Sequence, residues 1–353
     1  MARKSWICLM MILFLGLSGC SNRIVDGQQV NKEEKIVIKF SHVVEENTPK
    51  GLAAIRFAQL IKERSRGSIE VQVFPNSQLF KDGEEFEALS RGDVQMIAPA
   101  TSKMSQLFPQ WQIWDLPYLF SDLESVHQIM DGPLGKTLLE QLEEENMRGL
   151  AMWDNGFKHL TNNIHPIIKL SDLKGLRFRV MSPGILQEQF FNFGANAIIL
   201  PFNDVYEALR EGSVEGQENT ISNIYTKKFS EVQKYLTLSQ HGFMGYAVIV
   251  NADFWDQLPS QARELIERTM SEVTLWERET AKELDKKQLE EIKKMKVLNI
   301  YSLTPREKMI WRKDFSSVYT KFEKENGSEF LNEAKQWIEL KGDNFEEGIN
   351  LGR

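Results

Sequence analysis

Polar and cationic side chains lie beside apolar runs in two segments of this 353-residue chain. The first segment, Leu173–Val180, contains Arg179, and the second, Val214–Tyr225, contains Asn219. A third apolar run, Leu200–Leu209, lies between them. A cation or an amide placed against a buried run costs free energy unless a partner meets it. The pattern therefore predicts a cleft that holds a small organic anion.

Arg179 is the first candidate for the contact with that anion. It lies near the end of a predicted strand over 176–181. Its planar guanidinium can hold a carboxylate through two parallel hydrogen bonds. A pairing with a structural Asp or Glu explains a strand-end arginine at least as well, so the residue type alone leaves both interpretations open.

Other polar side chains near these segments each allow two interpretations. Asn219 could donate to a carboxylate or cap the helix that follows it. Lys158 follows Asn155-Gly156, which predicts a turn after a buried strand, and a solvated loop lysine is the simpler interpretation. His42 could donate to an anion or be a structural histidine. Aromatic residues are more often core than pocket wall, and the nearby ones are Phe202, Tyr225 and Tyr246.

The sequence lacks the signatures of common enzymes. It contains neither a glycine-rich phosphate loop nor a Gly-x-Ser-x-Gly string, and its five histidines show no metal-ligand spacing. The net charge of −7 and the lack of a dense basic patch argue against nucleic acid as a partner. We therefore expect a binding protein with no catalytic residues, no cofactor and no metal.

The N-terminus predicts a targeting segment. A short basic region precedes an apolar run over 6–17, which is short for a bilayer span. The run ends in Leu17-Ser-Gly-Cys20, the order that a lipoprotein signal peptidase accepts. We expect residues 1–19 to be removed and Cys20 to be lipidated, with an ordinary secretory signal or an uncleaved anchor as the alternatives. Cys8 would leave with the signal, so the mature chain would have no disulfide.

Strand-like and helix-like segments alternate after a polar tether over 20–35. This rhythm predicts a mostly parallel sheet covered by helices, with ligands outside the carboxyl ends of the strands. A long charged helix is expected over 259–297, and Thr304–Glu307 is typical of a helix N-terminus. The main expected strands are 36–40, 69–74, 94–98, 176–181, 197–200, 235–238 and 246–251.

The length and this pattern predict two α/β domains. Residues 36–153 with 246–280 are expected to form domain I, and residues 154–245 with 281–353 to form domain II. The long helix would lean across both domains.

Four strings, in this order, resemble the solute-binding proteins of TRAP (tripartite ATP-independent periplasmic) transporters. The resemblance covers nearly the whole mature chain, from about Ile36 to beyond Trp311. The strings are Lys174-Gly-Leu-x-x-Arg-Val180, Phe202-x-x-Val-Tyr-x-Ala-Leu209, Val214-x-Gly-x-Glu-Asn219 and Lys228-x-x-Glu-Val-Gln-Lys-Tyr235.

The resemblance implies a hinged, two-domain periplasmic-binding-protein-like fold. It implies a carboxylate-holding arginine at Arg179 with Asn219 as its partner, and it places Lys158 where many members have an arginine. The segments around His42, Lys158 and Asn223 resemble the branch that binds four-carbon dicarboxylates. The ligand contacts implied in this way are Arg179, Asn219, Lys158, His42, Phe202, Asn223 and Tyr246.

We therefore expect a lipid-anchored receptor outside the cytoplasm that binds malate, succinate or fumarate and delivers it to TRAP membrane permease subunits. The sialic-acid branch has a glutamate near Ala100, and its absence here argues against sugar acids. Two alternatives stay open. One is the same fold binding another organic acid, such as a keto acid, and the other is a co-receptor that reports to a sensor kinase.

Overall fold

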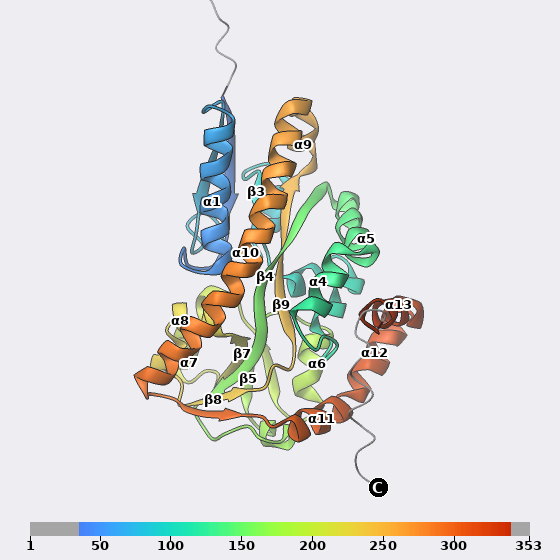
Figure 1. The fold of residues 1–353 in the computed structure, drawn as a ribbon. Coiled ribbons are helices and arrows are strands. Elements are labelled where there is room, and N and C mark those ends of the chain that lie inside the picture. Colours follow the sequence, from blue (N-terminus) through green and yellow to red (C-terminus); the bar gives the residue numbers. More distant parts are fainter. Residues whose placement is uncertain (1–34, 340–353) are drawn as a thin grey trace, which may run out of the picture. The chain divides into compact units, whose positions relative to one another are not determined.

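A computed structural model describes residues 35–339 of the chain. The predicted signal peptide and the predicted lipidation site, Cys20, lie outside the described residues. Within the described range, strands form a central sheet and helices cover it (Figure 1). The strands are β1 Ile36–Ser41, β2 Ile69–Phe74, β3 Met96–Ile97, β4 Met147–Asn162, β5 Arg177–Val180, β6 Asn196–Ile199, β7 Gly216–Thr220, β8 Tyr235–Leu238, β9 Phe243–Asn251 and β10 Asn299–Ser302.

The sheet is mixed rather than mostly parallel. Its strand order is β2-β1-β3-β9-β4-β7-β5-β6, with β8 beside β4 and β10 beside β8. The pairs β1–β2, β1–β3, β5–β6, β5–β7 and β8–β10 are parallel. In contrast, β9 runs antiparallel to β3 and β4, and β4 runs antiparallel to β7 and β8. The prediction of a mostly parallel sheet was wrong because residue alternation does not reveal the direction of a strand's neighbour.

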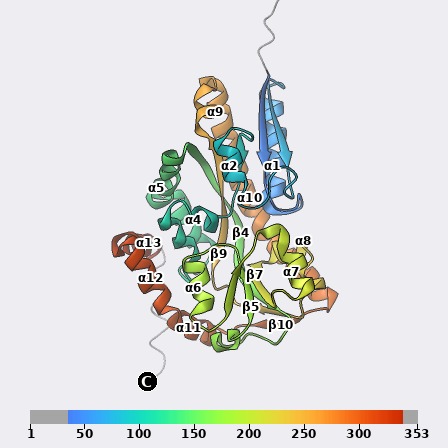
Figure 2. The ribbon, with the colours of Figure 1, turned by 180° about the vertical axis from the view of Figure 1, so that it is seen from behind.

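Helices pack on this sheet, and the longest of them, α10, has 36 residues. It contacts α1, β4 and α8 (Figures 1 and 2). At about 1.5 Å per residue it extends roughly 54 Å, which agrees with the long helix expected over 259–297. The helices are α1 Pro49–Arg64, α2 Glu85–Ser90, α3 Thr101–Met104, α4 Leu123–Asp131, α5 Pro133–Gln141, α6 Ile185–Phe191, α7 Val205–Glu211, α8 Ile221–Thr226, α9 Ala252–Gln257, α10 Ser260–Met295, α11 Pro305–Asp314, α12 Ser316–Asn326 and α13 Ser328–Glu339.

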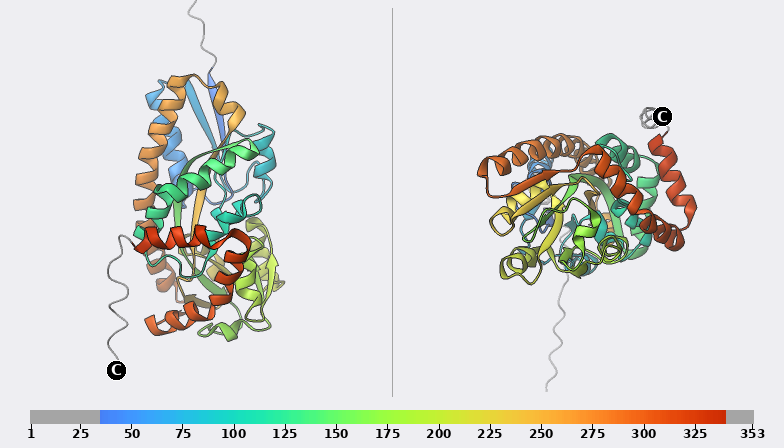
Figure 3. Two further views of the ribbon diagram at one scale, coloured as in Figure 1. Left: turned by 90° about the vertical axis from the view of Figure 1, so that its right-hand side faces the viewer. Right: turned by 90° about the horizontal axis from the view of Figure 1, so that it is seen from below.

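Local signals fix several helix starts. The Thr48 side chain accepts a hydrogen bond from the backbone of Gly51, and Pro49 occupies the first turn of α1. Thr304 and Glu307 form a reciprocal capping box at the start of α11. The chain then continues through α12, which contacts α6, and α13, which contacts α4 (Figure 3).

One predicted turn is absent from the structure. Strand β4 continues through Asn155 and Gly156, and the register with β9 shifts between Asp154 and Gly156. Gly156 has a φ of 130°, which a residue with a side chain rarely adopts. A β-bulge of this kind accommodates Gly156 without ending the strand. Lys158 therefore lies inside a central strand and not in a loop.

Candidate functional site

A small cavity lies where the carboxyl ends of several parallel strands meet. Its walls include Val43 after β1, Lys103 after β3, Arg179 near the end of β5 and Asn219 near the end of β7. The space for the centres of water-sized molecules is about 30 Å³, roughly enough for two waters. This position agrees with the usual place of ligands in open α/β sheets.

Arg179 is buried in the cavity wall with one donor group left over. Its Nε and Nη2 donate to the carbonyl oxygen of Leu200 at 3.0 and 2.9 Å. Its Nη1 is buried and has no hydrogen-bond partner among residues 35–339. Burial lowers the pKa of Arg179, while Asp82 and Glu218 raise it, and an arginine stays charged in such surroundings. Arg179 therefore pairs with a neutral carbonyl oxygen in this structure. The N–H groups of its Nη1 remain available to an anionic ligand.

Lys103 and Asp82 form a second charged group in the same wall. Their side chains are 8% and 9% exposed, and Lys103 Nζ lies 3.2 Å from Asp82 Oδ2. The same oxygen accepts the backbone N–H of Phe202 at 2.8 Å. Neither residue is among the ligand contacts predicted from the sequence. Lys103 follows the predicted strand 94–98, and a cation after a strand could have indicated a site residue. Asp82 lies in a loop, where no sequence pattern indicated a role.

Two asparagines line the cavity beside Arg179. Asn219 Oδ1 accepts from Asn223 Nδ2 at 2.7 Å, and Asn219 Nδ2 donates to Gln217 Oε1 at 3.1 Å. The N-cap of α8 is Thr220 and not Asn219, so the capping alternative for Asn219 does not apply. In the described part of the chain Asn223 Oδ1 has no hydrogen-bond donor. The pair presents fixed amide groups to the cavity.

Phe202 and Tyr246 are both core residues and cavity walls. They are 7% and 2% exposed, and both line the cavity. The Tyr246 hydroxyl accepts from Asn155 Nδ2 at 2.7 Å. Burial raises the pKa of Tyr246, so its hydroxyl stays neutral. Together the two rings provide apolar surface between the polar groups.

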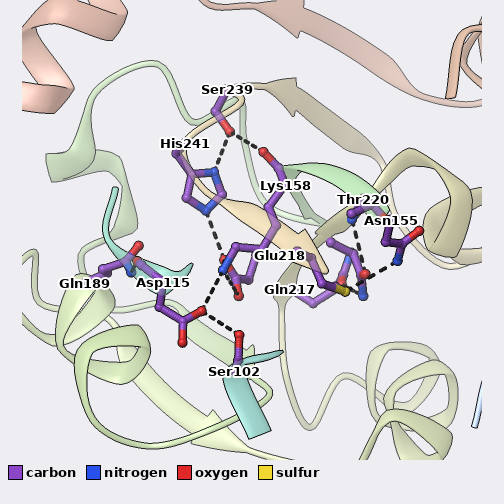
Figure 4. Close-up of polar contacts among 12 residues, drawn as sticks. Ser102, Asp115, Asn155, Lys158, Gln189, Gln217, Glu218, Thr220, Ser239 and His241 are labelled. Atoms are coloured by element: carbon purple, nitrogen blue, oxygen red, sulfur yellow. Dashed lines mark hydrogen bonds and ion pairs between the residues drawn. The ribbon is translucent and has the colours of Figure 1, made fainter. Parts of the chain in front are cut away.

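Lys158 lies outside this cavity, in a buried network of charges. Its Nζ is 3.1 Å from Glu218 and 3.4 Å from Asp115 (Figure 4). Glu218 also contacts His241 Nε2 at 3.0 Å, and Ser239 Oγ lies 2.7 Å from His241 Nδ1. Burial alone would raise the pKa of Glu218, but Lys158 and His241 lower it to about 2. Two carboxylates therefore already meet the charge of Lys158.

His42 is also close to the cavity without lining it. It is fully buried and immediately precedes the wall residues Val43 and Val44. Burial and the charge of Lys50 lower the pKa of His42 to about 3, so the ring is neutral. The structure thus brings five of the seven predicted contacts into the cavity wall, which are Arg179, Asn219, Phe202, Asn223 and Tyr246.

No three His, Cys, Asp or Glu side chains within residues 35–339 are grouped as a metal site would require. No helix in that same range combines the length and the apolar composition needed to cross a membrane.

Comparison with known proteins identifies the family. The model of bacterial extracellular solute-binding protein family 7, DctP, matches residues 40–326. The chain therefore belongs to this family, and the resemblance to TRAP solute-binding proteins is confirmed. A C4-dicarboxylate-binding protein of Bacillus subtilis, DctB, is 44% identical over 334 residues, covering 94% of this chain and 95% of the relative.

Solved structures confirm the fold. A TRAP periplasmic solute-binding protein from Sulfurospirillum deleyianum, with bound succinate, has a TM-score of 0.83 and 41% identity, covering 85% of this chain and 98% of its own. One from Pseudomonas aeruginosa, with bound L-malate, has a TM-score of 0.79 and 38% identity, covering 81% of this chain and 99% of its own. The protein has the periplasmic-binding-protein-like α/β fold that sequence analysis predicts.

Proposed function

We propose that this protein captures a four-carbon dicarboxylate, such as succinate, malate or fumarate, and delivers it to the membrane subunits of a TRAP transporter. The observation that carries the proposal is the buried Nη1 of Arg179, which lacks a partner in the described chain and lies in a cavity wall. An unpaired buried donor costs about 1–3 kcal/mol, and an anionic ligand removes that cost. The relatives named above support the ligand class.

The two ends of the ligand have different partners in this proposal. Arg179 holds one carboxylate, with Asn219 and Asn223 beside it, and Lys103 attracts the other. Asp82 offsets one of the two cationic charges, so these three lining side chains leave one net positive charge. A dicarboxylate suits this arrangement better than a monocarboxylate, because its second carboxylate can share Lys103 with Asp82 and balance the remaining positive charge.

Closure around the ligand would bring distant segments of the chain together. Loops after β1 and β2 contact segments that follow β6 and α8. Ser77 Oγ lies 2.8 Å from Asn203 Oδ1, and Lys227 Nζ lies 2.9 Å from Glu45 Oε1. Separating these loops would open the cavity, so the ligand would shift an open–closed equilibrium toward the closed form. The domain boundaries proposed above, 36–153 with 246–280 against 154–245 with 281–353, describe that motion.

The same proposal covers anchoring and release. Lipidated Cys20 would hold the protein on the outer face of the membrane, where a solute-binding protein meets its permease. His42 and Lys158 remain proposed ligand contacts that would require movement of the cavity wall. The ligand would leave chemically unchanged, because the proposed role is capture and not turnover.

Calorimetry with succinate, malate, fumarate and butyrate tests the proposal. We expect the purified protein to bind the dicarboxylates and Arg179→Lys to lose at least about 2 kcal/mol of binding free energy, since an ammonium cannot make the two-pronged contact. Thermal unfolding would verify that the variant folds. Wild-type affinity for every dicarboxylate in folded Arg179→Lys would reject the assignment. Binding of only a keto acid in a thermal-shift panel would select the alternative ligand class.

A further inference from the structure

A buried lysine lies directly behind the cavity wall. Lys50 on α1 is fully buried, and its Nζ donates to the carbonyl oxygen of Ala98 at 2.7 Å. The same Nζ lies 3.7 Å from the centre of the Tyr246 ring, a favourable position for a cation over an aromatic face. Tyr246 and Ala100 both line the cavity. The ammonium group of Lys50 therefore contacts a residue that lines the ligand space.

A buried carboxyl group belongs to the same cluster. Glu85 on α2 is 1% exposed, and neither of its carboxyl oxygens has a hydrogen-bond partner among residues 35–339. A buried ionised carboxylate without hydrogen bonds is costly, so such a group tends to take up a proton. The charged side chains that face Glu85 are Lys50, Asp82 and Lys103. Two of these, Asp82 and Lys103, line the cavity themselves.

Lys50 and Glu85 are close enough for their charges to interact. Burial lowers the pKa of Lys50 to about 8 and raises the pKa of Glu85 to about 8. Glu277 on α10, Asp82 and His42 also face Lys50; burial raises the pKa of Glu277, and His42 is neutral because burial and Lys50 lower its pKa. Whichever of Lys50 and Glu85 releases the proton, the pair loses one positive charge near pH 8, because two interacting groups titrate as one system.

The charge of the Lys50–Glu85 pair affects how strongly a doubly charged ligand binds. Arg179, Lys103 and Asp82 give the cavity wall one net positive charge. The pair raises this to two when it holds its extra proton, which matches the two negative charges of a dicarboxylate. After the proton is lost, a bound dianion leaves one negative charge unbalanced in a buried site. A dianion therefore favours the protonated pair, and a monoanion favours it less.

We propose that Lys50 and Glu85 are positioning residues that select the doubly charged form of the ligand and take up a proton when a dianion binds in alkaline solution. The inference rests on the proposed function, since it takes a dicarboxylate as the ligand.

Calorimetry of succinate binding between about pH 6.5 and about pH 9.5 tests this inference, with buffers of different ionisation enthalpy to count protons. The wild-type dissociation constant should be level at low pH and rise above about pH 8, approaching tenfold per unit for one linked proton. Up to one proton should be taken up per succinate in that range. Butyrate, with a single charge, should show a smaller rise.

Lys50→Met removes the cation while keeping an unbranched side chain. We expect it to weaken succinate binding near neutral pH by at least about fivefold, a typical coupling between neighbouring groups, and to abolish proton uptake. Lys62→Met removes an exposed lysine from the same helix and should leave both quantities unchanged. Glu85→Gln keeps the cation of Lys50 and removes the carboxyl as a source of the released proton, so the weakening should begin at a pH no lower than in the wild type.

The outcomes separate this inference from the proposed function. Equal proton uptake in the wild type and Lys50→Met would assign the linked proton to another group, such as Lys103, and would overturn the inference. Tight succinate binding without proton uptake at any pH would do the same and leave the proposed function standing. Failure of succinate, malate and fumarate to bind at every pH would reject the proposed function itself. If Lys50→Met does not fold, weakening that begins at lower pH in folded Glu85→Gln than in the wild type overturns the inference.

Discussion

Lys158 on β4 and Glu218 on β7 form an ion pair with an N–O distance of 3.1 Å, and both side chains are completely buried. The two strands run antiparallel, and residue 218 is opposite Leu160 in their register. Asp115 and His241 complete the charge balance around the pair. A buried pair of this kind contributes little net stability by itself, but removing one partner leaves the other uncompensated.

The first prediction concerns that pair. Lys158→Met should lower the free energy of unfolding by about 3–5 kcal/mol, because Glu218 and Asp115 lose their shared cation. Adding Glu218→Gln should restore part of the loss. Urea denaturation of the wild type, both single variants and the double variant would measure this. Strict additivity of the two single changes would contradict a direct interaction between the residues.

The second prediction concerns acid. Burial, with His241 and Lys308 adding to its effect, lowers the pKa of His159 from 6.5 to about 3. A lowered histidine pKa means that the unfolded chain binds the proton first, so stability falls as pH drops from about 6.5 toward 3. The slope is at most about 1.4 kcal/mol per pH unit for one group. The His159→Gln variant should show a shallower decline in a pH series of urea denaturation, and an unchanged slope would assign the decline to other groups.

The third prediction concerns ligand charge. Lys103→Met should weaken succinate binding by about tenfold or more and change butyrate binding little, because only the dicarboxylate has a second anionic end. The variant should be combined with Asp82→Asn, so that no carboxylate remains without its cation. Calorimetry of both ligands gives the comparison. An equal loss of affinity for succinate and butyrate would show that Lys103 does not bind the second carboxylate.

The fourth prediction concerns the N-terminus. The wild-type protein expressed in a bacterial host should fractionate with membranes, because two or more acyl chains on Cys20 give stable anchoring. Cys20→Ser should be released or remain unprocessed. Intact-mass measurement of the mature chain is the direct readout. A mature protein without acyl mass would favour an ordinary secretory signal.

Several elements could be predicted from local sequence. The residues 235–238 form β8 as expected, and the long helix is Ser260–Met295, within two residues of the expected ends. Thr304 and Glu307 form the capping box that their spacing indicates. These features depend on side-chain alternation, helical periodicity and hydrogen bonds within one turn, all of which act over a few residues. The same short strings were sufficient to identify the family.

Tertiary structure decided which charged groups meet. The sequence indicated Arg179 as a buried cation, but only the fold brings Lys103 and Asp82, from distant segments, into the same wall. The sequence favoured Lys158 as a loop residue, whereas β4 continues past Gly156 with a register shift and buries Lys158 between two carboxylates. The physical reason is that burial and the approach of opposite charges depend on packing between remote strands, which no local pattern encodes.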